Sequence, residues 1–539
     1  MRFQKLFLSI LSGVLLWLAW PTYGFAVLLF VAIVPLLWME QSIRKECYGK
    51  SNFKVWSIAY VGLLIWNVAT TYWLINSTVF GFLFANLVNT ALMATVFLGY
   101  HIIAKRTTQG AALTFLACLW MCFEWLHLHW EFSWPWLNLG NGFSEYTSWI
   151  QWYEYTGTFG GTLWVWIVNI AIFKGLIVIK QTVNKERRQQ FFFKYGIISL
   201  ALILLPIIAS FIIESHTRNL SEDSQTAEVL ILQPNIEPYQ EKYTLTNNQI
   251  AAKLVQLASQ NISDRTRLIV APETVLADHI IMDDLDIDES IQTLRKFLYN
   301  YQGTSLMGGI SLLEVFSDEK RKTKQSNFDP TSLLYFNDYN SAFLLGTSKE
   351  IELYHKSKLV VGVENFPYKS VLEPVIGNAM ISMGGASYTK TTQKERGVFN
   401  LQPIIAAPII CYESVYGSYL NGYDSQEANL FTIITNDAWW GNTQGHKQHL
   451  SIARLRAIEY RKYVARSANT GISAIINHYG DIEQQLDYDT VGSIKGTVRL
   501  KDQRTFYSRN GDYISRIAAF GALFIILFSS LRRGKTKRK

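Results

Sequence analysis

Long apolar runs constrain this chain more than any other feature of its sequence. A run of about 20 apolar residues is long enough to cross a bilayer as a helix. We expect such spans at about 5–20, 24–39, 55–76, 80–104, 111–128, 160–180, 195–213 and 513–531. The first run could also be a cleaved signal peptide, but it lacks a small-x-small cleavage site. The sequence therefore predicts a multi-pass α-helical membrane domain with about eight spans.

The composition of the 539-residue chain is unevenly distributed, with 49% hydrophobic and 17% charged residues overall. The stretch from about 220 to 510 has the composition of a soluble domain and is long enough to bury its own core. We expect four parts in the chain. They are a membrane domain at 1–213, a polar linker at 214–226, a folded domain at 227–510, and a last span with a basic tail at 511–539.

The positions of lysine and arginine predict how the chain is oriented. Clusters of basic residues flank the spans at 2–5, 44–54, 105–106, 180–194 and 532–539. The alternate connections at 77–79 and 129–159 contain no lysine or arginine. The positive-inside rule then places both termini in the cytoplasm of a bacterial inner membrane and 227–510 on the outer, periplasmic face. The net charge of +8 comes largely from these flanks, so it requires no nucleic-acid partner.

The connection at 129–159 is rich in tryptophan, including Trp134 and Trp136. An interfacial aromatic belt explains this density as well as a surface that contacts lipid headgroups does. We carry Trp134 and Trp136 forward as candidates for lipid contact. Glu124 and Lys174 lie within or near spans, where a charge is either functional or reaches toward the interface.

The pattern from 227 to 510 alternates short β-rich runs with helical stretches, which predicts an α/β domain around a largely buried sheet. Strands are expected at Ala227–Gln233, Leu268–Ala271, Ser305–Ile310, Ser341–Leu345, Ile404–Ile410, Leu430–Asn436 and Ser473–Ile476. Helices are expected at Asn247–Ser259, Ser290–Tyr301 and His446–Arg466. The charged stretch Ser317–Thr331 is interpreted as a mobile loop.

Three polar side chains follow strand-like runs in this domain, namely Glu273, Lys356 and Cys411. Groups at strand ends gather at one rim of an α/β sheet. A cysteine thiol needs a base to become a nucleophile, and a carboxylate can take that proton. A lysine, with the backbone N–H of Tyr412, can stabilise the oxyanion that forms. Taken singly each residue is weak evidence, because a free cysteine is usually a small core residue.

The four cysteines lie at 47, 118, 122 and 411 without the spacing of a metal site or a disulfide framework. The sequence also lacks a phosphate-binding loop and a dinucleotide fingerprint. We therefore expect no metal and no cofactor.

Four motifs resemble those of the nitrilase superfamily of carbon–nitrogen hydrolases. They are Pro272-Glu273-Thr274, Tyr354-His355-Lys356, Cys411-Tyr412-Glu413 and the run from Thr435 to Gly441. With spans on both sides of the domain, the chain resembles the apolipoprotein N-acyltransferase family. The segment Phe132-Ser133-Trp134-Pro135-Trp136 is similar to that family's Phe-Pro-Trp in the membrane part.

The resemblance implies a nitrilase-like α-β-β-α sandwich with Glu273, Lys356 and Cys411 as the catalytic residues. It also implies supporting roles for Glu364, Tyr412, Glu413 and Asn436. The family's Pro-Phe-Gly-Glu run is replaced here by Val361-Gly362-Val363-Glu364, which keeps the acid but changes the loop around it.

The implied reaction moves the sn-1 acyl chain of a phospholipid, expected to be phosphatidylethanolamine, onto Cys411 as a thioester. The α-amine of the diacylglyceryl-cysteine of an apolipoprotein then takes the chain as an amide. The stretch 377–385, with Met380 and Met383, is a candidate lid or an ordinary surface loop, and Trp439 is a further candidate for lipid contact.

Two other functions compete with this one. A membrane-tethered amidase or nitrilase that hydrolyses a soluble amide would use the same three residues. It would not need the tryptophan-rich connection or seven preceding spans. A non-catalytic lipid-binding or transport protein is a third possibility, and the intact Glu, Lys and Cys argue against it.

Overall fold

The computed structural model describes residues 2–46, 51–220, 225–237, 244–348, 350–365, 367–368 and 388–536. The chain divides into two compact units. The helical unit comprises 1–72, 82–217 and 510–539, and the sandwich unit comprises 73–81 and 218–509. The candidate lid residues Met380 and Met383 lie outside the described residues.

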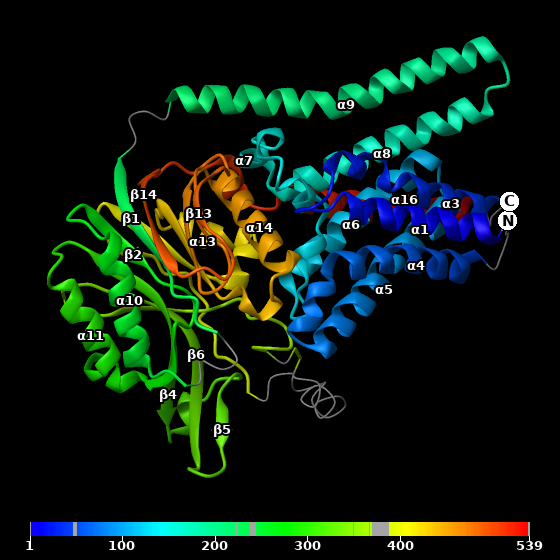
Figure 1. Ribbon diagram of the computed structural model, residues 1–539. Coiled ribbons are helices and arrows are strands. Elements are labelled where there is room, and N and C mark those ends of the chain that lie inside the picture. Colours follow the sequence, from blue (N-terminus) through cyan, green and yellow to red (C-terminus); the bar gives the residue numbers. More distant parts are fainter. Residues whose placement is uncertain are drawn as a thin grey trace. The chain divides into compact units, whose positions relative to one another are not determined.

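The helical unit is built from apolar helices (Figure 1). They are α1 (Arg2–Leu18), α2 (Leu29–Ala32), α3 (Val34–Glu46), α4 (Ser51–Thr71), α5 (Val79–Ala104), α6 (Gln109–His129), α7 (Tyr153–Thr156), α8 (Thr158–Gln181), α9 (Lys185–Leu220) and α16 (Tyr513–Thr536). Seven helical stretches of the described chain are long and apolar enough to cross a membrane, and Phe3–Leu18 is a shorter apolar helix. The predicted multi-pass helical domain is confirmed, with about eight spans if α1 is included.

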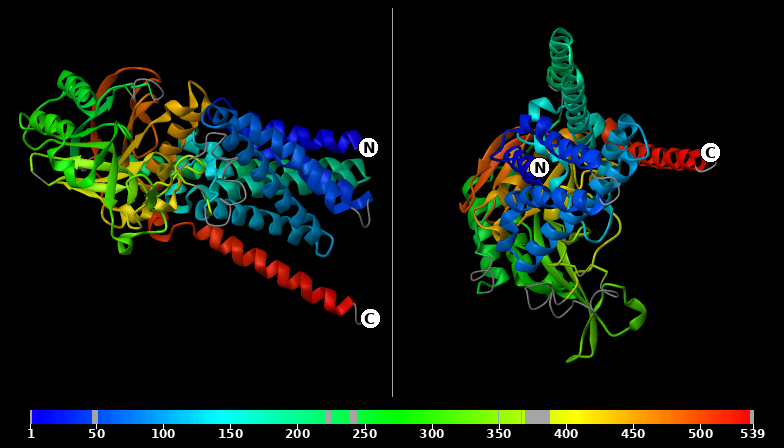
Figure 2. Two further views of the ribbon diagram at one scale, coloured as in Figure 1. Left: turned by 90° about the horizontal axis from the view of Figure 1, so that it is seen from below. Right: turned by 90° about the vertical axis from the view of Figure 1, so that its right-hand side faces the viewer.

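Small residues let α1 and α4 pack closely, as the blue helices do in both views of Figure 2. A Cβ added to Gly13 would lie 2.0 Å from the backbone oxygen of Gly62. A Cβ on Gly62 would lie 2.1 Å from the backbone oxygen of Ser9. Because apolar association within lipid depends on close contact and not on water exclusion, such glycines set the helix spacing.

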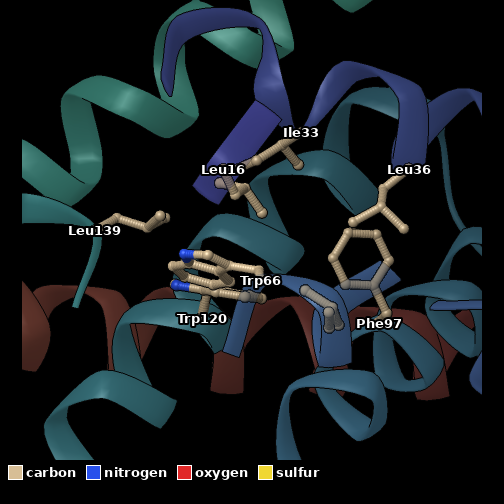
Figure 3. Close-up of a pocket in the computed structure, with 8 residues that line it drawn as sticks. Leu16, Ile33, Leu36, Trp66, Phe97, Trp120 and Leu139 are labelled. Carbon is tan, nitrogen blue, oxygen red and sulfur yellow. The ribbon is translucent and has the colours of Figure 1, made fainter. Parts of the chain in front are cut away.

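Aromatic side chains fill the interior of the helical unit. Figure 3 shows Trp66 and Trp120 lying face to face beside a narrow apolar pocket, with ring centroids 6.5 Å apart. Glu124, an open question from the sequence, lies nearby on α6 and accepts hydrogen bonds from Leu139 N and Thr162 Oγ1, each 2.7 Å long. It therefore anchors the tryptophan-rich connection to α6 and α8.

That connection is compact, and it contains the short helices η3 (Pro135–Leu137), η4 (Leu139–Phe143) and η5 (Thr147–Trp149). The Trp136 side chain is 2% exposed, which argues against its predicted contact with lipid. Trp134 is half-buried.

The first half of the linker expected at 214–226 is helical, and the boundary between the two units falls within it. Helix α9 continues through Glu214 to Leu220, and strand β1 begins at Thr226. The polar residues after the apolar run were interpreted as a helix end, but they carry no glycine or proline that would stop a helix.

The sandwich unit contains two mixed sheets. The first has eight strands in the order β14-β1-β2-β4-β6-β5, with β3 beside β4 and β7 beside β6. Its strands are β1 (Thr226–Gln233), β2 (Thr266–Val270), β3 (Leu276–Ile281), β4 (Ser305–Phe316), β5 (Asn327–Asp329), β6 (Leu334–Leu345), β7 (Glu352–His355) and β14 (Gly492–Arg499). Strands β1, β2 and β4 are parallel, whereas β6 is antiparallel to both β4 and β7.

The second sheet has six strands in the order β13-β12-β11-β10-β9-β8. They are β8 (Phe399–Leu401), β9 (Ile404–Ile410), β10 (Leu430–Thr435), β11 (Tyr463–Ala468), β12 (Ser473–Ile476) and β13 (Ile482–Leu486). The central strands β9, β10 and β11 are parallel and fully or almost fully buried. Buried parallel strands have continuous apolar sequences, which is why β9 and β10 could be predicted.

The two sheets pack face to face, with β1 against β11 and β12. Helices α10 (Asn247–Asn261) and α11 (Glu289–Leu298) cover the outer face of the first sheet. Helix α14 (Gln444–Tyr460) packs against β11 on the opposite side, as Figure 1 shows. This arrangement confirms the predicted α-β-β-α sandwich.

Two sequence predictions in this unit are wrong. The helix expected over His446–Arg466 ends at Tyr460, because Arg461 adopts a left-handed conformation with φ 53° and closes the helix. The residues that follow form β11, whose pairing with β10 and β12 overrides their helix-forming composition. The loop expected at Ser317–Thr331 contains strand β5, which pairs with β6.

Gly309 on β4 allows the chain that carries Glu273 to lie against the sheet. A Cβ at Gly309 would lie 2.2 Å from the backbone nitrogen of Thr274 and 2.6 Å from Cα of Glu273. We expect Gly309→Ala to destabilise the sandwich unit by about 1–3 kcal/mol, as overpacking does in other cores. Thermal unfolding in detergent checks this, with Gly346→Ala as the matched control, because its Cβ would meet Ser305 Oγ at an ordinary 3.5 Å. Equal melting temperatures for the two variants would contradict the account.

Candidate active site

The sheet topology brings Glu273 and Lys356 to the same rim. Glu273 follows β2, and Lys356 follows β7. Strand β4 is parallel to β2, and β6 is antiparallel to both β4 and β7. Strand β7 therefore runs in the same direction as β2, and both strands end at this rim. Lys356 Nζ lies 2.9 Å from Glu273 Oε1 and 2.9 Å from Glu364 Oε2. The predicted Glu364 therefore reaches the lysine despite the changed loop that precedes it.

Asn340 on β6 holds this ion cluster together, and no sequence motif points to it. Its Nδ2 donates hydrogen bonds of 2.9 Å to Glu273 Oε1 and of 2.9 Å to Glu364 Oε1. Its backbone oxygen accepts a 2.8 Å hydrogen bond from Lys356 N. An asparagine within a strand is a common surface residue, and only the pairing of β6 with β7 places it beside the carboxylates.

Burial makes the charges of this cluster depend on one another. Lys356 is 1% exposed and Glu273 is 6% exposed. Burial by itself disfavours the ammonium, but the carboxylates of Glu273 and Glu364 raise the pKa of Lys356 well above its usual range. Burial opposes the Glu364 charge as well, and the Lys356 ammonium together with Val360 N lowers the pKa of Glu364. Lys356 is therefore held as a cation between two acids.

Cys411 begins the turn η9 (Cys411–Val415) directly after β9, and its backbone is in the left-handed region with φ 49°. Such a conformation costs energy for a non-glycine residue and is found at sites whose surroundings enforce it. The cysteine is free and 8% exposed. Burial and the Glu273 carboxylate raise the pKa of the Cys411 thiol well above its usual range, while Lys356 opposes the rise. The resting thiol is therefore protonated at neutral pH.

Glu413 ties the cysteine turn to the lysine loop. It is fully buried and accepts hydrogen bonds from Ile410 N (2.9 Å), Ser357 N (2.7 Å), and the hydroxyls of Tyr354 and Tyr419 (2.8 Å each). The motif residues Tyr354 and Glu413 thus bind each other across two loops. In this arrangement Glu413 acts as a hydrogen-bond acceptor that fixes the backbone N–H groups of Ile410 and Ser357.

A second buried charge network lies behind the cysteine turn. His449 Nδ1 is 2.9 Å from Asp437 Oδ1, and Arg466 Nη2 is 2.7 Å from Asp437 Oδ2. On its other side, His449 Nε2 lies 2.9 Å from Ser414 Oγ and 3.3 Å from the Cys411 carbonyl oxygen. Burial would raise the pKa of Asp437, but Arg466 and His449 hold it well below its usual range. This network fixes the carbonyl of the strained cysteine.

Asn436, a predicted supporting residue, joins the two parts of the site. Its backbone N–H donates a 3.2 Å hydrogen bond to Glu273 Oε2. Its side chain caps the next turn through Ala438 N. Asn436 therefore positions Glu273 from the end of β10 in the second sheet.

Residues 73–81, which comprise the end of one predicted span, the short connection after it and the start of the next span, contact the sandwich unit. Trp73 Nε1 donates to Gln448 Oε1 (3.3 Å), and Asn76 Nδ2 donates to the backbone oxygen of Trp440 (2.9 Å). The Trp440 ring in turn lies 5.5 Å from His449. The apolar composition of Trp73-Leu74-Ile75 hides this role in a sequence.

The remaining candidates are divided between the two units. Trp134 and Trp136 belong to the helical unit, whereas Trp439 is half-buried in the sandwich unit. Tyr412 follows Cys411 on the turn, where its ring packs against Tyr416 at 5.2 Å. Within the described residues there is no group of three His, Cys, Asp or Glu side chains that could hold a metal ion.

Two family models match the chain. Residues 229–507 match the carbon–nitrogen hydrolase model, and residues 12–171 match the model of the apolipoprotein N-acyltransferase N-terminal domain. The first match covers more than half of the 539 residues.

Similar proteins extend over nearly the whole chain. The apolipoprotein N-acyltransferase of Chlorobaculum tepidum is 25% identical over 98% of this chain and 97% of its own length. That of Geobacter metallireducens is 25% identical over 98% of this chain and 95% of its own. Among solved structures, an amidase from Nesterenkonia sp. is 13% identical, with a TM-score of 0.36 over 54% of this chain and 95% of that one.

The raised pKa of the thiol predicts how Cys411 reacts with iodoacetamide. Alkylation should be slow at neutral pH and accelerate well into the alkaline range, because only the thiolate reacts. Glu273→Gln removes a negative charge and should move the midpoint of this profile to lower pH. Lys356→Met removes the opposing positive charge and should move the midpoint to higher pH. Peptide mass spectrometry of the Cys411 peptide measures both, and shifts in the same direction would contradict the charge assignment.

The hydrogen bonds to Glu413 predict a stability loss in Glu413→Gln. The amide would turn one acceptor into a donor that faces buried N–H and O–H groups. We expect a loss of about 1–3 kcal/mol and a lower melting temperature. Glu427→Gln, at an exposed glutamate, is the matched control. An unchanged melting temperature for Glu413→Gln would show that Glu413 does not tie the two loops together.

Proposed function

Because this chain belongs to the carbon–nitrogen hydrolase family, as a membrane-embedded apolipoprotein N-acyltransferase, we propose the following reaction for it. The enzyme transfers the sn-1 acyl chain of a phospholipid, through a thioester on Cys411, to the α-amino group of the S-diacylglyceryl-cysteine of apolipoproteins. The observation that carries the proposal is the strained, buried cysteine beside the Glu273–Lys356–Glu364 cluster, in a chain with seven candidate membrane spans.

The first half-reaction needs a base because the thiol is protonated at rest. Glu273 takes the proton of Cys411 as sulfur attacks the ester carbonyl of the phospholipid. The Lys356 ammonium and the N–H of Tyr412 stabilise the oxyanion. When the tetrahedral intermediate collapses, the carbon–oxygen bond breaks and the lysophospholipid leaves with the proton from Glu273. The acyl chain remains on sulfur.

The second half-reaction uses the same groups in turn. The α-amine of the apolipoprotein attacks the thioester, and Glu273 accepts a proton from the amine. Collapse breaks the carbon–sulfur bond, forms the amide and returns Cys411 to a thiolate, which then regains the proton. Glu364 does not need to contact substrate here, because its hydrogen bonds to Lys356 and Asn340 keep the lysine charged and oriented.

The location of the reaction follows from the basic clusters of the sequence. The positive-inside rule supports cytoplasmic termini and an outer, periplasmic sandwich unit, in the inner membrane of a bacterium. Both proposed substrates are lipids or carry them, which suits a catalytic unit tethered by spans. Aminolysis requires that water be kept from the thioester. A lid at 377–385 with Met380 and Met383 stays a prediction.

The alternative, a tethered amidase that hydrolyses a soluble amide, is less well supported. An amidase would use the same rim residues. It would not explain why residues 12–171 match the model of the apolipoprotein N-acyltransferase N-terminal domain. The two reactions differ in the adduct on Cys411, which is a long acyl chain only in the proposed function.

The proposed thioester can be detected directly. The purified full chain in detergent is incubated with a phosphatidylethanolamine of defined sn-1 chain, and the Cys411 peptide is weighed. We expect a hydroxylamine-sensitive gain equal to that acyl group, lost in Cys411→Ala. Glu273→Gln should slow its formation at least about 100-fold, since a positioned base contributes that much.

The exposed Glu289→Gln variant is the control for loss of a carboxylate and should react like the wild type. Folded wild-type protein that forms no acyl adduct would remove phospholipid as the donor. An adduct on a residue other than Cys411 would contradict the assignment of the nucleophile.

A further inference from the structure

Two basic side chains gather beside the cysteine turn without an acidic partner of their own. Arg396 lies over the Tyr419 ring, with its Cζ 3.8 Å from the ring centroid. Lys358 Nζ lies 4.8 Å from the centroid of Tyr416 and 5.8 Å from that of Tyr419. In the described part of the chain neither side chain forms a salt bridge. We call Lys358 and Arg396 the basic pair.

The basic pair is adjacent to the candidate active site. The Tyr416 ring packs on Tyr412, which directly follows Cys411. The Tyr419 hydroxyl donates a hydrogen bond to Glu413 on the same turn. Lys358 itself is two residues beyond Lys356. A ligand held by the basic pair would therefore lie next to a substrate that reacts at Cys411.

The two cations of the basic pair repel each other, and Lys358 is also largely buried. Burial, with Arg396 as the next contribution, lowers the pKa of Lys358. The Nε of Arg396 is buried and has no hydrogen-bond partner. Unsatisfied buried donors are rare in folded proteins, and each calls for an acceptor. An oxygen-rich anion would relieve both the repulsion and the missing acceptor.

The local chain is shaped to hold Arg396 in this place. A Cβ on Gly422 would lie 2.7 Å from Cγ of Arg396, so the arginine stem needs a glycine there. The buried carboxylate of Glu413 offsets part of the positive charge, although it contacts the backbone N–H of Lys358 and not the ammonium. Two cations and one carboxylate leave one net positive charge.

We infer that Lys358 and Arg396 form a binding subsite for a phosphodiester, the phosphate group of the phospholipid acyl donor. A phosphodiester carries one negative charge and oxygen acceptors, which match the net charge of the pair and the free Nε–H of Arg396. The inference rests on the proposed function and deepens it, because it explains how a membrane-lipid ester is chosen over a neutral one.

The test compares two donors with the same sn-1 chain, phosphatidylethanolamine and the uncharged diacylglycerol. Thioester formation on Cys411 is followed by intact mass against donor concentration in mixed micelles. For Lys358→Gln/Arg396→Gln we expect the half-saturating concentration of phosphatidylethanolamine to rise about tenfold or more, the loss typical of a charge-assisted contact. The maximal rate should change little, and the reaction with diacylglycerol should be unaffected.

Three further variants separate binding from support of the fold. Lys394→Gln removes an exposed charge two residues before Arg396 and should behave as the wild type. Lys358→Arg keeps the charge and should preserve the preference for phosphatidylethanolamine. Gly422→Ala displaces the arginine without removing its charge and should weaken phosphatidylethanolamine use alone. Equal losses with both donors in the double variant would overturn the inference and make the basic pair a structural element.

Inorganic phosphate and a binding measurement distinguish the remaining outcomes. At constant ionic strength, phosphate should compete with phosphatidylethanolamine but not slow diacylglycerol. Equal inhibition of both would assign the subsite to free phosphate and overturn the headgroup assignment. Native mass spectrometry of Cys411→Ala counts bound phosphatidylethanolamine without thioester chemistry, and the basic-pair substitutions should reduce it. That loss would support the subsite even if wild-type protein formed no thioester, an outcome that would refute the proposed function alone.

Discussion

Lys356 carries a positive charge in the interior of the sandwich unit, held 2.9 Å from each of two acids. Removing such charges from water costs several kcal/mol per ion, and the mutual attraction repays this only if the remaining donors and acceptors are satisfied. Here Asn340 binds both acids, Asn436 N binds Glu273, and Val360 N binds Glu364. The positions of the strand ends, the lysine loop and the acid loop are thus set by one electrostatic requirement.

This cluster also contributes to the protonation state of the nucleophile. Burial favours the Cys411 thiol over the thiolate, and the Glu273 carboxylate adds to this effect while the Lys356 ammonium opposes it. A protonated thiol is unreactive, so Cys411 becomes a nucleophile only when the base removes its proton during the reaction with a substrate. The Asp437–His449–Arg466 network supplies the complementary part, since it fixes the carbonyl and the strained backbone of the same cysteine. In the proposed mechanism the two networks divide the tasks of proton transfer and positioning.

The sequence was sufficient to predict the apolar helices, the sandwich and the residues that meet at the rim. Those predictions rest on apolar runs and on short motifs in which Glu273, Lys356 and Cys411 follow buried strands. Asn340 could not be predicted, because its partners come from strands that are distant in sequence. The contacts of residues 73–81 with the sandwich unit were not predicted, and strand β11 was misassigned, because an apolar or helix-forming composition does not report which surface a segment packs on. Tertiary contacts decide such cases.

The central claim is that the acyl chain passes from Cys411 to an amine and not to water. The most direct measurement isolates the acyl-enzyme made with a labelled sn-1 chain, free of donor, and adds a diacylglyceryl-cysteine peptide. We expect the label to leave the enzyme and enter the peptide as a hydroxylamine-resistant amide, and an N-acetylated peptide to receive none. Release of the label as free fatty acid at the same rate with either peptide would contradict the account and identify a hydrolase.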